Sequence, residues 1–395
     1  GEDVVLTIDA ELQMMVMDRL GNESASVVVM DVHTGDVISM VSTPGFDPNS
    51  FNLGINHADW KELLDDPRKP LINKPLRGQY PPGSTFKMIV ALAALESGAV
   101  TEDFQTFCSG KLKYGNHTFH CWKKHGHGLQ DMVSAIEHSC DVYFYEIARK
   151  TGINRIAAMA ERFGLGDITG IGVGGERSGL VPTKEWKLAT IGEPWQGGET
   201  LNVGIGQGHV LTTPLQLAMM TAQLANGGKR VRPRLMYSLD AEKETDGKTA
   251  DKEPAVPEQN QSLGLSEHAL SIVLEGMRRV TNSPTGTAFR ARIKDPAMAM
   301  SGKSGTAQVR RISKYERDTR VLKNKERAWR ERDHALFVAF APVETPRYAI
   351  SVVVEHGGGG SSVAGPIARD ILEATQKRDP ARTPPMGVAA VRNQD

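Results

Sequence analysis

The fold of this chain is decided by one stretch, Pro81-Pro82-Gly83-Ser84-Thr85-Phe86-Lys87. Proline and glycine end whatever element comes before them, so a new element begins here. The residues that follow, 88–95, read MIVALAAL without a polar break, and Gly98 then provides a natural helix stop. A segment of about three turns that is apolar on every side is typical of a buried central helix. We therefore predict such a helix, with Ser84 in its first turn.

Ser84 and Lys87 form a candidate nucleophile and base. They are three residues apart, so their side chains share one face of a helix. A serine hydroxyl attacks well once a base takes its proton, and an adjacent lysine amine can be that base. Burial and the positive helix end both lower a lysine pKa toward the neutral amine. Taken alone, S-x-x-K is common by chance, and a capping serine beside a solvated lysine is the alternative.

The composition is that of an ordinary globular protein, with 39% hydrophobic and 24% charged residues. The formal net charge is zero, which gives no support for a nucleic-acid partner. No apolar run approaches the length of a membrane span, and the start, Gly1-Glu2-Asp3, is no signal peptide. We expect a soluble domain whose sequence begins within a longer protein.

Strand patterns lie at both ends of the chain and helical patterns in the middle. Strands are predicted at 4–9, 25–32, 37–41, 299–312, 335–343 and 347–355. Besides the central helix, helices are predicted at 10–20, 129–138, 142–150, 213–226, 266–280 and 365–377. Pairing the terminal strands gives an α+β fold: an antiparallel sheet flanked by helices, plus an all-helical subdomain. The stretch 108–128 shows no periodicity and is predicted to be a loop.

Polar segments delimit this domain, which we place at residues 1–379. Residues 238–261 are charged and contain proline, as expected of a mobile loop. Residues 310–332 are strongly charged and form either a solvated loop or a lip over a substrate groove. Residues 380–395 lack core residues and are predicted to be a disordered tail.

Two further patterns follow the serine stretch. Ser139-Cys140-Asp141 places a hydroxyl and a carboxylate between two predicted helices. Residues 301–308, SGKSGTAQ, begin a predicted edge strand whose small side chains let a substrate backbone lie close. The order S-x-x-K, S-x-[DN], K-[ST]-G resembles the penicilloyl-serine transferases, which comprise penicillin-binding proteins and serine β-lactamases.

The resemblance extends beyond these three motifs to the transpeptidase domain of class B penicillin-binding proteins. The residues 6–9 (LTID), 46–49 (FDPN) and 204–208 (GIGQG) match it, so it covers residue 4 to about residue 377. The stretch 122–128 (WKKHGHG) and an aspartate at Asp141 look most like the elongation-specific members of that class. The septal type is the nearest competitor.

The resemblance implies a role for each motif residue. The catalytic residues would be Ser84, Lys87, Ser139 and Lys303. Ser84 would attack the carbonyl between two D-alanines of a peptidoglycan stem peptide, and Lys87 would take its proton. Ser139 would relay a proton to the leaving amine, and Lys303 would add positive charge. An amine of a second stem peptide would then attack the acyl-enzyme, and β-lactams would acylate the same serine.

The substrate-binding residues would be Asp141, Ser304, Gly305 and Thr306. Ser304 and Thr306 would bind the terminal carboxylate, and the backbone N–H groups of Ser84 and Thr306 would form the oxyanion hole. Asp141, if ionised, cannot donate a hydrogen bond to the acyl side chain, unlike the commoner asparagine. The alternatives within and beyond this reaction are a D,D-carboxypeptidase or β-lactamase, and a β-lactam sensor that does not turn over.

Known members of the family are anchored in the cytoplasmic membrane by an N-terminal helix, and a non-catalytic domain follows it. Neither is present in this sequence, so the resemblance implies a periplasmic fragment of a longer protein. It further implies a membrane glycosyltransferase of the shape, elongation, division and sporulation family, together with the elongation machinery, as partners. No organic cofactor is expected.

The three cysteines and one histidine form a candidate metal site: Cys108, Cys121, His127 and Cys140. They are separated by twelve, five and twelve residues without a C-x-x-C pair, so spacing alone leaves three possibilities open. These are a zinc site, a Cys108–Cys121 disulfide, and three reduced buried cysteines. The loop lacks apolar residues to stabilise itself, and elongation-type relatives hold a zinc beside the active site. Both points favour a structural zinc, with His120 and His125 as competing ligands.

Overall fold

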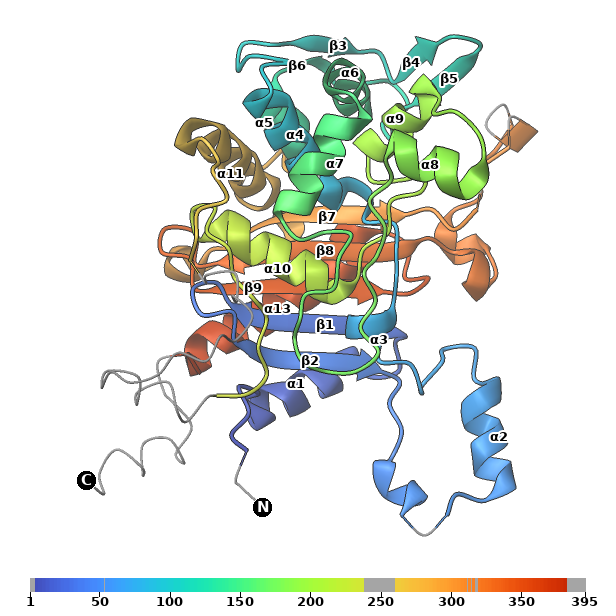
Figure 1. Cartoon of the computed structure of the whole chain (residues 1–395), viewed down its shortest axis with the longest axis vertical. Helices are drawn as coiled ribbons and strands as arrows, with labels where there is room; N and C mark the ends of the chain where they lie inside the picture. The colour runs from blue at the N-terminus through green and yellow to red at the C-terminus, as the bar shows by residue number, and fades with distance from the viewer. Residues whose placement is uncertain are drawn as a thin grey trace.

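The computed structural model describes residues 4–52, 54–237, 260–310, 312–313, 315–316 and 319–381. Most of the predicted mobile loop (238–261) and nearly all of the predicted tail (380–395) lie outside the described residues. Figure 1 shows a central sheet with a helical layer on one side of it.

Five strands form one antiparallel sheet in the order β2-β1-β9-β8-β7. Their bounds are β1 (Ala25–Asp31), β2 (Val37–Thr43), β7 (Ser301–Ala307), β8 (His334–Ala341) and β9 (Tyr348–Val354). The prediction that strands from both ends of the chain pair is therefore confirmed, and β7 is an edge strand. The predicted strand at 4–9 is wrong: only a single bridge, Leu6 to Met236, forms there, and both side chains are exposed.

The strand β9 and nearly all of β8 are buried on both faces of the sheet, because helices cover both sides of these strands. The helix α1 (Ala10–Leu20) packs on β2 and buries the predicted stripe of Leu12, Val16 and Leu20. The helix α10 (Pro214–Ala225), capped by Thr213, is buried along its whole length against β9 and β1. The last helix, α13 (Gly365–Arg378), packs on β8 and β9.

The central helix predicted from the sequence is α4 (Lys87–Glu96), buried from Lys87 to Ala94. It is surrounded by α5 (Met132–Glu137), α6 (Asp141–Thr151), α7 (Ile153–Arg162) and α11 (Glu267–Asn282). Further helices are α2 (His57–Asp65), α3 (Lys74–Arg77), α8 (Lys184–Ile191) and α9 (Gly197–Gly204). Within the described part of the chain, no helix combines the length and apolar character that a membrane span needs.

The helical subdomain is not all-helical, and the predicted loop at 108–128 is folded. It contains two small antiparallel ladders, β3 (Thr106–Cys108) with β6 (Gly128–Gln130), and β4 (Lys111–Tyr114) with β5 (His117–His120). The strands of the β4–β5 hairpin are mostly exposed. KLKY alternates polar and apolar residues over only four positions, and HTFH does not alternate, so the pair gives little strand signal.

Candidate active site

Ser84 lies in a tight turn that leads into α4. The turn is a 3-10 helix, Gly83–Phe86, and the backbone N–H of Lys87 donates to the Ser84 carbonyl. The prediction of Ser84 within the α-helix is therefore wrong by one turn. In a 3-10 turn, side chains three residues apart are eclipsed, so Ser84 and Lys87 still point to the same side. Ser84 is half-buried and Lys87 is fully buried.

The serine turn is held against two distant segments. The Gly83 N–H donates to the Gly206 carbonyl at 2.9 Å. A Cβ added at Gly83 would lie 2.7 Å from the Thr306 carbonyl oxygen, and one at Gly206 would lie 2.0 Å from the Gly83 oxygen. Such contacts admit only glycine. The first motif, the edge strand and the 204–208 stretch thus meet in one place.

The hydroxyl of Ser139 lies between two buried lysine amines. Lys87 Nζ donates to Ser139 Oγ at 3.2 Å and to the Ser139 carbonyl at 2.9 Å. Lys303 Nζ lies 2.9 Å from the same Oγ and donates to the Ser304 carbonyl at 3.0 Å. Ser139 has a φ of +53°, a left-handed conformation that non-glycine residues adopt rarely and mainly at functional sites. The structure therefore brings Lys87, Ser139 and Lys303 together as predicted.

The charges in this cluster are set by burial. Asp141 Oδ1 forms an ion pair with Lys87 Nζ at 2.7 Å. Burial raises the pKa of Asp141, and the Lys87 charge opposes that shift. Burial, together with the nearby Lys87, lowers the pKa of Lys303 well below its ordinary value. Burial thus opposes the positive charge that the resemblance implies for Lys303.

Trp122 ties the loop that carries the cysteines to the second motif. Its backbone N–H donates to Asp141 Oδ2 at 2.9 Å. Its indole N–H lies 3.1 Å from the carbonyl oxygens of both His138 and Ser139. Trp122 therefore fixes the backbone that orients the Ser139 side chain. Nothing in the sequence pattern marks this role, because it depends on carbonyl directions that tertiary packing sets.

Three of the four predicted substrate-binding residues lie on the edge strand β7, and the fourth, Asp141, begins α6. Ser304 is half-buried, Gly305 is buried and Thr306 is exposed. A Cβ at Gly305 would lie 2.8 Å from the Pro82 oxygen, so glycine lets the strand approach the serine turn. The Thr306 carbonyl accepts a hydrogen bond from Gln207 Nε2 at 3.0 Å. This edge is available to an extended peptide.

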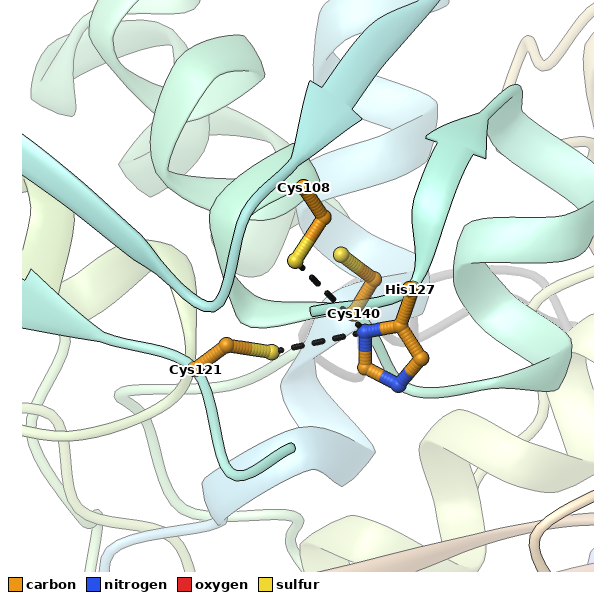
Figure 2. A group of neighbouring side chains, drawn as sticks. All are labelled: Cys108, Cys121, His127 and Cys140. Atoms are coloured by element: carbon orange, nitrogen blue, oxygen red, sulfur yellow. Dashed lines mark hydrogen bonds between the residues drawn. The ribbon is translucent and has the colours of Figure 1, made fainter. Parts of the chain in front are cut away.

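The four predicted metal ligands converge, as Figure 2 shows. Their ligand atoms all lie within 4.8 Å of one another, and the three cysteines are free thiols. His127 Nδ1 lies 3.6 Å from Cys108 Sγ and 3.5 Å from Cys121 Sγ. In a tetrahedral zinc site, bond lengths of ~2.3 Å to sulfur and ~2.0 Å to nitrogen separate S and N by about 3.5 Å. The donor set therefore fits zinc.

The immediate surroundings of this cluster also suit a metal. The hydrogen bond between Cys140 and Cys121 lowers the pKa of the Cys121 thiol and raises that of Cys140. The ring of His127 lies 5.3 Å from that of Trp122, which links the cluster to the second motif. His120 and His125, the competing ligands, are not part of the group that the described residues form.

The chain matches the profile of the penicillin binding protein transpeptidase domain over residues 25–373. Peptidoglycan D,D-transpeptidase MrdA of Escherichia coli K12 is 38% identical over 98% of this chain and 61% of that protein. MrdA of Acinetobacter baumannii is 37% identical over 97% of this chain and 55% of that protein. The chain thus spans about three fifths of the length of the curated relatives it matches.

Two solved structures are similar in fold along nearly the whole chain. The crystal structure of Pseudomonas aeruginosa PBP2 in complex with WCK 5153 has a TM-score of 0.82 and 39% identity, covering 95% of this chain and 78% of that one. The complex of PBP2 with MreC from Helicobacter pylori has a TM-score of 0.80 and 32% identity, covering 95% and 64%. The α+β architecture predicted from the sequence is the fold of these proteins.

Proposed function

Because the chain belongs to the penicillin-binding protein transpeptidase family, we propose that it is an elongation-type peptidoglycan D,D-transpeptidase that works through an acyl-enzyme at Ser84. The observation that carries this proposal is the Ser139 hydroxyl held between the Lys87 and Lys303 amines beside the serine turn. β-Lactams would acylate the same serine.

Acylation begins with the transfer of a proton from Ser84 Oγ to Lys87. Lys87 Nζ is held in place for this transfer by Asp141 Oδ1 at 2.7 Å and by the Ser139 carbonyl at 2.9 Å. Ser84 then attacks the carbonyl between the two D-alanines. The backbone N–H groups of Ser84 and Thr306 stabilise the oxyanion, because the serine turn lies against Thr306.

Collapse of the tetrahedral intermediate breaks the peptide bond and releases D-alanine. Its leaving amine takes a proton from the Ser139 hydroxyl, which Lys87 reprotonates across 3.2 Å. Ser304 and Thr306 bind the substrate's terminal carboxylate, and this negative charge favours a protonated Lys303 in the complex. An amine of a second stem peptide attacks the ester and forms the cross-link.

We also propose that Cys108, Cys121, His127 and Cys140 bind one zinc ion. Four protein ligands close a tetrahedral site and leave no position for a catalytic water, so the ion's contribution is structural. Cys140 lies between Ser139 and Asp141, so an ion bound to Cys140 would fix the backbone of the second motif. No organic cofactor is part of the proposal.

The partners follow from the relatives. One relative was solved with MreC, and another structure concerns a synthase complex that coordinates polymerization and crosslinking. We propose that a membrane glycan polymerase of the shape, elongation, division and sporulation family supplies nascent glycan to this chain on the periplasmic side of the cytoplasmic membrane.

Cross-linking by this chain alone is expected to be poor. Holding both stem peptides on one nascent glycan raises their effective concentration, so adding the polymerase and its product should increase cross-links about a hundredfold. The yield is measured by chromatography of digested product, with Ser84→Ala as the inactive control. Efficient cross-linking of free stem peptides by the isolated chain would contradict this dependence, and D-alanine release without any cross-link would indicate a carboxypeptidase.

A further inference from the structure

A large cavity joins the active site at Asp141. Its volume is about 1420 Å³, and its walls come from the β4–β5 hairpin, Trp122, the start of α9 and several residues between 308 and 321. In Figure 1 the hairpin lies next to α9 at the far end of the helical layer. Among the residues of the three catalytic motifs, Asp141 is the one that lines the cavity. The cavity therefore extends away from the reacting groups.

The hairpin wall is firmly attached to the helices. A Cβ at Gly197 would lie 2.2 Å from the Tyr114 hydroxyl, so the absence of a side chain lets the hairpin rest on α9. The rings of Phe119 and Tyr145 lie 5.5 Å apart, and the Tyr145 hydroxyl donates to the His120 carbonyl at 3.0 Å. The cavity is thus a preformed feature of the fold.

Among the described residues, the acidic side chains that line the cavity are ion-paired, whereas two lysines are not. Asp141 is paired with Lys87 at 2.7 Å, and Glu199 with Lys187 at 2.8 Å, so both acidic side chains of the wall are neutralised. Lys111 and Lys124 also line the cavity, and neither forms an ion pair within the described part of the chain. The cavity therefore presents uncompensated positive charge.

The direction of β7 indicates which part of a bound substrate peptide would extend into the cavity. The strand runs from Lys303 past Thr306, and Gln308, just beyond its end, lines the cavity. An antiparallel peptide on this edge, with its terminal carboxylate at Ser304 and Thr306, extends its preceding residues toward Gln308. Gln207, which now occupies the Thr306 carbonyl, would yield that acceptor to the peptide.

We infer that the cavity binds the part of the donor stem peptide that precedes D-alanyl-D-alanine, and that Lys111 and Lys124 bind free carboxylates there. The inference rests on the proposed function and deepens it: the donor is an acidic peptide rather than an amidated one. Lys111 and Lys124 are specificity-determining residues and take no part in the bond-forming steps.

The test compares two synthetic donor peptides ending in D-alanyl-D-alanine with a free terminal carboxylate, one with free upstream carboxylates and one with these amidated. An exposed ion pair contributes a factor of roughly two to five, so the double variant Lys111→Ala/Lys124→Ala should raise KM for the acidic donor about four- to twenty-five-fold. Its kcat and its acylation by benzylpenicillin stay unchanged. The amidated donor should show the raised KM with the unsubstituted chain and no further increase with the variant. The matched control is Lys113→Ala/Lys123→Ala, whose side chains lie outside the cavity wall.

Direct binding of both peptides to Ser84→Ala by calorimetry provides a second readout that needs no turnover. Equal affinities for the acidic and amidated donors would overturn the inference while leaving the proposed function intact. An effect confined to the acceptor amine's KM would assign the cavity to the second stem peptide and would equally overturn it. Failure of benzylpenicillin to acylate the unsubstituted chain would instead defeat the proposed function, and the inference with it.

Discussion

Lys87→Ala is expected to slow the acylation of Ser84 by a β-lactam about a hundredfold or more, the usual scale for loss of a general base. The Lys87 amine is fully buried and bonds to Ser139 and Asp141, so water has little access to replace it. Time-resolved intact-mass spectrometry gives the rate, corrected for the folded fraction because the variant leaves the buried Asp141 carboxylate unpaired.

A second buried lysine supplies the matched control. Lys74 is 1% exposed and donates to the Thr43 carbonyl at 2.8 Å. Within the described residues, its side chain forms no hydrogen bond or ion pair with the three motifs. Lys74→Met should lower the melting temperature and leave the acylation rate per folded molecule unchanged. A Lys87→Ala variant that acylates nearly as fast as the unsubstituted chain would show that the base lies elsewhere.

Removing the proposed zinc ion is expected to affect stability and acylation together. Binding free energy at structural zinc sites is on the order of 10 kcal/mol and acts as folding free energy, so Cys121→Ser or chelation should lower the melting temperature by about 10 °C or more. Acylation should slow as well. Trp122, the residue after Cys121, donates hydrogen bonds to Asp141 and to the Ser139 carbonyl. Disorder of the Cys/His cluster should therefore also displace Asp141 and Ser139.

The control for the metal is His125→Ala, since His125 lies outside the converging group and should retain both zinc and stability. Ser84→Ala should also keep its metal. Elemental analysis measures the stoichiometry in protein prepared without chelator. A value near zero, with a Cys108–Cys121 disulfide found by mass, would replace the proposed site with a covalent cross-link.

Much of the site could be predicted from the sequence because its residues stand in short motifs with local structural meaning. The apolar run after Lys87 predicts a buried helix, and the small residues around Lys303 predict an edge strand. Capping signals at Thr213 and Ser266 place two helix starts correctly. The Cys/His group could be predicted from residue type, from the lack of apolar residues in its loop and from the resemblance to elongation-type relatives. Its spacing alone left three possibilities open.

The features of the site that could not be predicted from the sequence depend on contacts between distant segments. The β4–β5 hairpin gives little strand signal because each strand has only four residues. It is stabilised by Leu112 and Phe119 against the core and by Tyr114 on Gly197. The hydrogen bond from the Trp122 indole to the Ser139 carbonyl depends on the left-handed backbone at Ser139, and no local sequence pattern predicts that conformation. The lowered pKa of Lys303 arises from burial by the complete fold.

The central claim, that Ser84 is the acylated nucleophile, is tested most directly by intact-mass spectrometry after incubation with benzylpenicillin, followed by peptide mapping. We predict one covalent adduct per chain, located on the peptide that contains Ser84 and absent from Ser84→Ala. An adduct on Ser139, or one that persists in Ser84→Ala, would contradict the account.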